Sequence, residues 1–307
     1  MTINGKPDLT VNVAGIQMSN PLMVASGTFG CGEEYSSLVD MSGLGAVVSK
    51  TVTPNVRQGN PSPRIVETSG GLLNAIGLHN VGAGAFILDK LPKLLDAGIP
   101  VIVSIGGRNA QDFIEVAGLL ADAEGVSGIE LNLSCPNVGD KIFAQDPAET
   151  GILVAAVRKK CSYPLIAKLS PQVTDITEIA GVCEKEGADA ISLINSFPGI
   201  AINADTRKPV LGNITGGLTG PAIKPLALKI VWDVCKVVKI PVIGMGGIMQ
   251  ASDAIEFMLA GASAFAVGTA LFCNPAAPDE IIRGIEEYLL KNSFESVSQI
   301  VGNLDGN

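Results

Sequence analysis

The sequence predicts a single α/β domain that folds as a (β/α)8 barrel of the TIM type. Eight short apolar segments recur along the chain, and segments with helical periodicity separate them. The eight strand candidates are residues 22–27, 46–52, 100–107, 128–135, 164–170, 190–196, 241–247 and 264–270. They are apolar over their whole length, which is typical of parallel strands that are covered on both faces. Eight such units in roughly 250 residues fit a closed barrel, and a doubly wound open sheet is the alternative.

The segments between the strand candidates carry the signals of helices. In QDFIEVAGLLADAEG, residues 111–125, four apolar residues share one helical face: Phe113, Val116, Ala117 and Leu120. A glycine stands just before the next strand in DAGIPV, AEGVSG, KEGADA and LAGASA, as expected where a helix ends. The segment DPAE, residues 146–149, combines an aspartate cap, a proline suited to the first turn and a glutamate at the third helical position.

Residues 1–307 are expected to form one domain, with residues 1–21 as an N-terminal extension. The alternating pattern DLTVNVAGIQM, residues 8–18, predicts a small β-hairpin that closes the bottom of the barrel. Two long polar connections, residues 53–82 and 197–222, follow the second and sixth strands. We expect these connections to form long βα loops over the carboxyl-terminal face, where barrels have their active sites.

Charge and hydropathy exclude several classes of partner. The net charge is −9, whereas a nucleic-acid surface needs clustered Lys and Arg, so no nucleic-acid partner is expected. No apolar run is long enough for a spanning helix, and MTINGKPDLT lacks the features of a signal peptide. These observations predict a cytoplasmic enzyme without a membrane partner.

The cysteines and the histidine argue against a metal site on this chain. Six cysteines occur, and no two of them have a CxxC or similar spacing, so they are expected to be free thiols. His79 is the only histidine, so a His-based metal site cannot form, and a Ser-His-Asp triad would have to be built around it.

The residues that end the eight strands predict one site, because the carboxyl ends of barrel strands converge on one mouth. These residues are Ser26, Lys50, Ser104, Cys135, Lys168, Asn195, Ser196, Gly246, Gly247, Gly268 and Thr269. Two lysines inside otherwise apolar strands favour an anionic ligand. The segments GMGGI and VGTAL supply backbone N–H groups where barrels commonly hold a phosphate, of either a cofactor or a substrate.

Cys135 is the candidate acid–base group. It lies in a Ser-Cys-Pro-Asn turn at a strand end, where a thiol can reach a substrate. A thiol has a pKa of about 8.5, and a nearby cation lowers that pKa. A phosphate-bearing cofactor, a lysine and a thiol base together suggest proton abstraction coupled to hydride transfer to a flavin.

Several motifs resemble those of class 1 dihydroorotate dehydrogenases over nearly the whole chain. They are NLSCPN (132–137), SKT (49–51), NAIGLHN (74–80), AKLSP (167–171), INS (194–196), GGLTGPAIKP (216–225), GMGGI (244–248) and VGTALF (267–272). ASGTFGCGEEY and LGNITGGLTGPAIKP resemble class 1B, the NAD-linked form. The resemblance implies oxidation of (S)-dihydroorotate to orotate in the de novo synthesis of pyrimidines.

The resemblance also implies a role for each matching residue. Cys135 would remove a proton from C5 of dihydroorotate while a hydride passes from C6 to N5 of FMN; class 2 enzymes, which are membrane-associated, use serine there. The substrate would be held by Lys50, Asn74, Ala75, Ile76, Gly77, Leu78, Asn132, Asn137, Asn195 and Ser196. FMN would be held by Ser26, Lys50, Thr51, Asn132, Lys168, Ile194, Gly220, Gly246, Gly247, Gly268 and Thr269.

Among the FMN residues, Lys168 would stabilise the anionic reduced flavin, and the glycines would take the phosphate. One departure from the family pattern is visible. Ser104 stands where the resemblance leads us to expect an asparagine, which puts one flavin contact in doubt.

Class 1B enzymes pass electrons from FMN to a second subunit that carries FAD and a [2Fe–2S] cluster and reduces NAD⁺. This chain lacks a GxGxxG fingerprint that opens a βαβ unit and a cluster-type cysteine spacing, so NAD chemistry would lie on a partner. The resemblance thus implies a homodimer of this chain within a heterotetramer.

Four alternatives remain open at this point. One is the class 1A form, a homodimer that uses fumarate, and another is the related dihydropyrimidine dehydrogenase. A third is a Schiff-base aldolase, in which Lys168 or Lys50 forms an imine. The last is a barrel that only binds a ligand or a partner.

Overall fold

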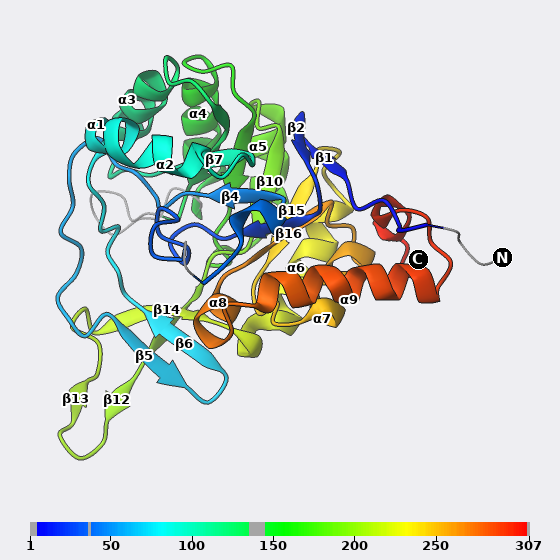
Figure 1. Cartoon of the computed structure of the whole chain (residues 1–307). Coiled ribbons are helices and arrows are strands. Elements are labelled where there is room, and N and C mark those ends of the chain that lie inside the picture. Colours follow the sequence, from blue (N-terminus) through cyan, green and yellow to red (C-terminus); the bar gives the residue numbers. More distant parts are fainter. Residues whose placement is uncertain (1–4, 36–37, 135–144, 306–307) are drawn as a thin grey trace.

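The computed structural model describes residues 5–35, 38–134 and 145–305, and its centre is a closed, eight-stranded parallel barrel (Figure 1). The barrel strands, in chain order, are β3 (Leu22–Val24), β4 (Ala46–Val48), β7 (Val101–Ile105), β8 (Val126–Asn132), β9 (Leu165–Lys168), β10 (Ala190–Leu193), β15 (Val242–Met245) and β16 (Ala264–Val267). The predicted (β/α)8 barrel is confirmed, and the alternative of an open sheet is wrong.

Helices follow the barrel strands and cover the outside of the barrel. They are α1 (Ala83–Ala85), η2 (Phe86–Lys90) and α2 (Leu91–Leu95) after β4, α3 (Ala110–Leu120), α4 (Pro147–Arg158), α5 (Ile176–Lys185), η4 (Pro221–Ile223) with α6 (Lys224–Cys235), α7 (Ala251–Leu259), and α8 (Thr269–Cys273) with α9 (Ala277–Lys291) and η5 (Val297–Ile300). Between β3 and β4 the described residues form only the short 3-10 helix η1 (Met41–Gly43). The strand–helix alternation is therefore regular from β4 onward.

Local signals in the sequence set the ends of these helices. The Asp146 carboxylate accepts hydrogen bonds from the backbone N–H groups of Ala148 and Glu149, at 2.9 and 3.2 Å, and caps α4 as predicted. The four glycines that precede the next strand have left-handed φ values between +69° and +115°; they are Gly98, Gly125, Gly187 and Gly261. Only glycine adopts this conformation without strain, so each helix ends where the sequence predicts.

A short hairpin of β1 (Val11–Val13) and β2 (Ile16–Met18) closes the amino-terminal end of the barrel, as predicted. Val13, Ile16 and Met18 are buried and pack against the apolar cluster inside the barrel. A methyl group added at Gly128, near the start of β8, would lie 2.9 Å from Cδ1 of Ile16. The hairpin thus inserts side chains into the bottom of the barrel.

The hairpin β1–β2 acts as a plug of the barrel, so shortening one of its buried side chains should destabilise the fold. Ile16→Ala is expected to lower the free energy of unfolding by about 2–5 kcal/mol, because Ile16 is only 4% exposed and its loss leaves a cavity. Urea denaturation measures the change. Ile152→Ala on α4, where the side chain is 68% exposed, is the control and should change stability by about 0.5 kcal/mol or less. Equal stability of the two variants would contradict the role of the hairpin as a plug.

The two long connections form a second sheet where the sequence analysis expected loops. They contribute β5 (Ile65–Thr68), β6 (Gly71–Asn74), β11 (Phe197–Ile200) and β14 (Thr215–Thr219), which pair antiparallel in the order β11-β14-β6-β5. A hairpin of β12 (Ile202–Asn203) and β13 (Lys208–Pro209) extends from this sheet, away from the barrel (Figure 1). Glycine- and proline-rich strands such as FPGI and TGGLT carry little strand signal, which is why the pattern did not predict them.

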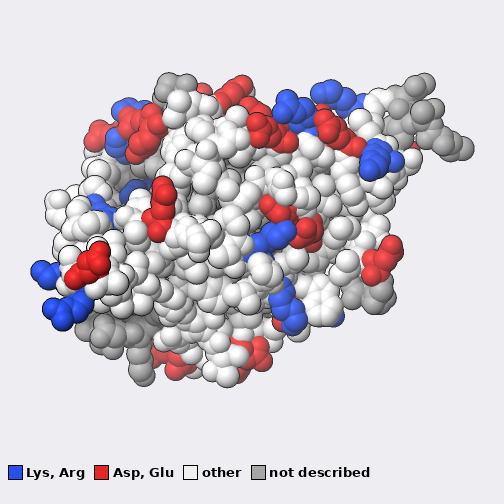
Figure 2. Space-filling model, turned by 90° about the horizontal axis from the view of Figure 1, so that it is seen from below, with Lys and Arg blue, Asp and Glu red and all other residues white. Residues whose placement is uncertain are grey.

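Charged side chains are interspersed over the surface. On the face shown in Figure 2, Lys and Arg lie among Asp and Glu and form no continuous positive surface. Within residues 5–35, 38–134 and 145–305, no helix is both long and apolar enough to cross a membrane.

Candidate active site

A cavity of about 850 Å³ lies between the carboxyl ends of the barrel strands and the four-stranded sheet. Of the residues predicted to hold the substrate or FMN, every one that the structure describes lines this cavity: Ser26, Lys50, Thr51, Asn74, Ala75, Ile76, Gly77, Leu78, Asn132, Lys168, Ile194, Asn195, Ser196, Gly220, Gly246, Gly247, Gly268 and Thr269. Cys135 and Asn137, which were also predicted, lie outside the described residues. The cavity volume is typical of a site for small molecules, which ranges over about 300–1,000 Å³.

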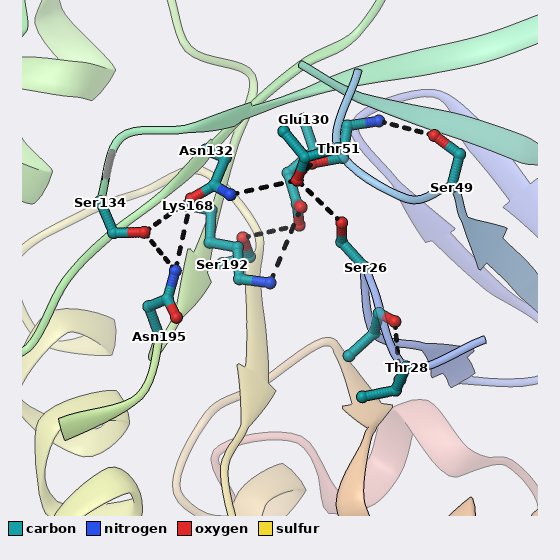
Figure 3. Close-up of polar contacts among 12 residues, drawn as sticks. Ser26, Thr28, Ser49, Thr51, Glu130, Asn132, Ser134, Lys168, Ser192 and Asn195 are labelled. Carbon is teal, nitrogen blue, oxygen red and sulfur yellow. Dashed lines mark hydrogen bonds and ion pairs between the residues drawn. The ribbon is translucent and has the colours of Figure 1, made fainter. Parts of the chain in front are cut away.

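Thr51 follows β4 after Ser49 and Lys50, and it lies at the centre of a network of hydroxyl groups on one side of the cavity (Figure 3). Its Oγ1 lies 3.1 Å from Ser26 Oγ and 3.0 Å from Ser104 Oγ, and it accepts a hydrogen bond from Asn132 Nδ2 at 3.1 Å. Ser104 is fully buried and does not line the cavity. Ser104, which stands where an asparagine was expected, therefore contacts Thr51 and not the cavity.

Asn132 links this network to the polar residues after β10 (Figure 3). Its Oδ1 accepts hydrogen bonds from Ser134 Oγ at 2.6 Å and from Asn195 Nδ2 at 3.3 Å. The Asn195 Oδ1 in turn accepts the backbone N–H of Ser196 at 2.7 Å. Ser134, which the sequence analysis did not select, also lines the cavity, and its position directly before Cys135 was the available signal.

Lys50 brings a cation to the cavity. Within the described part of the chain, no acidic side chain lies within ion-pair distance of its ammonium group. Burial lowers the pKa of Lys50, and the nearby Cys31 and Glu34 partly oppose this shift. Such a lysine is suited to bind an anion, because a bound anion would replace the solvation that burial removed.

Lys168, the last residue of β9, is the second cation of the site and is almost fully buried. Its Nζ lies 3.8 Å from Oε1 of Glu130, a residue of β8 that points into the barrel (Figure 3). Ser192 Oγ on β10 donates a hydrogen bond of 3.2 Å to Oε2 of Glu130. The sequence analysis missed Glu130, although a charged residue inside an apolar strand was a visible signal.

Two glycine-rich turns meet at one end of the cavity. Gly220, Gly246 and Gly247 have positive φ values of +97°, +124° and +80°. A Cβ at Gly247 would lie 2.8 Å from the carbonyl oxygen of Gly220, and a Cβ at Gly220 would lie 3.3 Å from Thr269 Cγ2. Three distant chain segments are thus close enough here for their backbones to approach one ligand, as a phosphate group requires.

Other polar residues at the mouth of the cavity were not predicted, because they lie in connections without a regular pattern. They are Arg57, Asn60, Arg108, Gln172, Asn213 and Thr215. Across the residues described, no group of three or more His, Cys, Asp or Glu side chains is placed to hold a metal ion.

Fold and site together define a (β/α)8-barrel enzyme with a ligand cavity at the carboxyl ends of its strands. The family model of dihydroorotate dehydrogenase matches residues 8–289. The chain therefore belongs to the dihydroorotate dehydrogenase family, and the predicted family resemblance is confirmed.

Curated relatives cover almost the whole chain. A protein of Geobacter sp. (strain M21) is 53% identical over 302 residues, which are 98% of this chain and 99% of the relative. A protein of Pelobacter propionicus is also 53% identical, and one of Geobacter sulfurreducens is 50% identical, each with the same coverage. All three are named dihydroorotate dehydrogenase B (NAD(+)), catalytic subunit.

Proposed function

We propose that this chain is the FMN-binding catalytic subunit of a class 1B dihydroorotate dehydrogenase, which oxidises (S)-dihydroorotate to orotate in pyrimidine synthesis. The observation that carries the proposal is the convergence of the described candidate residues on one cavity, in a chain whose relatives carry this name. An aldolase or a barrel that only binds a ligand would not account for the match to the dihydroorotate dehydrogenase family over residues 8–289.

The residues of the cavity fit FMN, which would supply the hydride acceptor when bound. The phosphate would be held by backbone N–H groups of the two glycine turns, where a side chain would fill the space. Lys168 would place a buried positive charge where reduction makes the flavin more negative. The residues proposed to hold FMN are Ser26, Lys50, Thr51, Asn132, Lys168, Ile194, Gly220, Gly246, Gly247, Gly268 and Thr269.

The remaining polar groups fit a small ring with a carboxylate. Lys50 would bind the carboxylate, because its ammonium group has no acidic partner among the described residues. The amides would pair with the ring carbonyl and N–H groups, and the hydrogen bond of 3.1 Å from Asn74 Nδ2 to the Gly217 carbonyl fixes one of them. The residues proposed to hold the substrate are Lys50, Asn74, Ala75, Ile76, Gly77, Leu78, Asn132, Asn137, Asn195 and Ser196.

Cys135 is the proposed base that removes the C5 proton of the substrate. Support comes from the family motif and from the preceding residue, Ser134, which lines the cavity. Burial raises the pKa of Cys183 and of Cys235 to about 12, so neither thiol is suited to accept a proton at neutral pH.

We further propose that the chain forms a homodimer in the cytoplasm and joins a subunit with FAD and a [2Fe–2S] cluster in a heterotetramer. The names of the relatives support a separate partner subunit, because a catalytic subunit implies another subunit and NAD(+) is the acceptor named. The homodimer, the cytoplasm and the partner's cofactors rest on the family resemblance alone.

Steady-state assays of the purified chain, alone and with the partner subunit, test the proposal. We expect dihydroorotate oxidation with NAD⁺ only when the partner is present. Fast turnover with fumarate by the lone chain would indicate the class 1A form. Activity on dihydrouracil without activity on dihydroorotate would indicate a dihydropyrimidine dehydrogenase.

Substitution in a glycine turn should weaken FMN binding. Gly247→Ala is expected to raise the dissociation constant of FMN at least about tenfold, because its φ is +80° and the new methyl group would lie 2.8 Å from the Gly220 carbonyl. Fluorescence titration of the apoprotein with FMN measures the constant. Gly118→Ala in α3 is the control, since a Cβ there meets nothing within 4 Å, and unchanged FMN affinity in both variants would contradict the assignment.

A further inference from the structure

Glu130 is a buried carboxylate inside the barrel that the proposed function does not yet use. It is 2% exposed and lies on β8 two residues before Asn132, so both side chains point into the barrel. The apolar side chains of the barrel interior surround this layer, and they include Met23, Val48 and Ile102. A carboxylate in such a place is strongly destabilising unless a cation and hydrogen bonds compensate it.

The described partners of Glu130 compensate it only in part. Its Oε2 accepts one hydrogen bond, from Ser192 Oγ at 3.2 Å, whereas Oε1 accepts none from any described residue. The only described cation nearby is the ammonium group of Lys168, at 3.8 Å from Oε1. A carboxylate has about four acceptor positions, so Glu130 depends chiefly on the charge of Lys168.

The dependence is mutual, because Lys168 has no other partner among the residues that the structure describes. Its side chain is 7% exposed, it lines the cavity, and its Nζ makes no hydrogen bond to any described residue. The three residues come from adjacent strands, since Ser192 pairs with Lys168 and Lys168 pairs with Asn132. The floor of the cavity therefore carries a buried ion pair and not a lone cation (Figure 3).

We propose that Glu130 is a positioning residue that holds Lys168 at the cavity floor and offsets its charge, so that the bound flavin is less easily reduced than beside an unpaired lysine. This inference rests on the proposed function, since it requires FMN in the cavity. Two opposite charges at this distance interact strongly in a site of low dielectric constant, so removal of one of them changes the field at the cavity. A flavin that passes its electrons to an acceptor must not have too high a reduction potential, and Glu130 would lower that potential.

The reduction potential of bound FMN tests this role without an assay of turnover. The holoprotein is reduced slowly with xanthine and xanthine oxidase, and a reference dye reports the potential. In Glu130→Gln, the ratio of reduced to oxidised FMN at the midpoint of the dye should rise about tenfold, because the Lys168 charge is no longer offset. Glu130→Asp keeps the negative charge and should return most of the way to the wild-type ratio.

Two further variants show whether Glu130 acts through Lys168. In Lys168→Met the ratio should fall below that of the wild type. A buried carboxylate that has lost its cation becomes neutral, so adding Glu130→Gln to that variant should change the ratio by less than about threefold. The double variant contains neither charge, so it remains measurable if Glu130→Gln alone does not fold, and its ratio should also lie below that of the wild type. Asp233→Asn on α6 removes one charge from an exposed ion pair with Lys229 and should leave the ratio unchanged.

The outcomes separate this inference from the proposed function. An unchanged ratio in Glu130→Gln would overturn the role of Glu130, and so would a tenfold difference between the two Lys168→Met proteins. A wild-type chain that binds no FMN would instead overturn the proposed function.

Discussion

Replacement of Cys135 by alanine should lower the turnover of dihydroorotate by about 10²–10⁴-fold while FMN remains bound. The expectation follows from the proposed role of the thiol as the only side chain that accepts the C5 proton. The FMN contacts proposed here lie on other residues, so the visible spectrum of the variant should match that of the wild type. Anaerobic mixing with dihydroorotate, followed by the absorbance of the flavin, measures the rate of the chemical step.

Cys273→Ala provides the control for this substitution. Cys273 is exposed at the end of α8, near the cavity, and carries a free thiol. Its removal should leave the rate within about twofold of the wild type. A Cys135→Ala variant with a near-normal rate would remove this thiol from the mechanism.

Replacement of Lys50 by glutamine should weaken the binding of orotate by about 10–10³-fold. Removing a partly buried ammonium group that pairs with a carboxylate leaves the carboxylate without its partner and costs about 1.4–4 kcal/mol, which corresponds to this range. Orotate is the product and does not react further, so its dissociation constant can be measured from the change in the flavin spectrum without turnover. A constant that stays within twofold of the wild type would contradict the role of Lys50.

The binding of orotate should also depend on pH in a direction that Lys50 sets. Burial lowers the pKa of Lys50 below its usual value of 10.5, so the ammonium charge is lost before pH 10.5 is reached. The dissociation constant should therefore rise as the pH rises through this lowered pKa. Glutamine does not titrate, so Lys50→Gln should bind orotate with the same weak affinity throughout this range.

The same burial predicts a gain in stability when Lys50 becomes methionine. A lysine whose pKa is lowered in the folded state destabilises that state as long as it is charged, and this penalty fades as the pH rises toward its unfolded pKa. Lys50→Met removes the penalty, and at pH 7 it should raise the melting temperature of the apoprotein. A melting temperature below that of the wild type would mean that Lys50 stabilises the fold.

Local patterns made the barrel predictable. Each barrel strand is a mostly apolar segment, and helix ends are marked by residues such as Asp146 and Gly187, whose effects act within a few positions of the chain. The site followed from topology, because the closed barrel brings the ends of distant strands such as β4 and β9 to one mouth. These features need no knowledge of contacts between distant residues.

Features that depend on distant contacts were not predictable. The second sheet joins β6 to β14, and its strands gain their order only from pairs such as Leu73 with Leu218. Glu130 was missed for the same reason, since its role depends on Lys168 and Ser192, which lie on other strands. The sequence shows a charge inside an apolar strand but does not show what it faces.

The visible spectrum of the purified chain without oxygen tests the central claim most directly. We expect a yellow protein that absorbs at about 450 nm and loses this absorbance when dihydroorotate is added, because the bound flavin would accept the hydride. Addition of the partner subunit and NAD⁺ should then restore the absorbance. A colourless protein, or a yellow one whose absorbance dihydroorotate does not change, would contradict the assignment of this chain as an FMN-dependent dihydroorotate dehydrogenase.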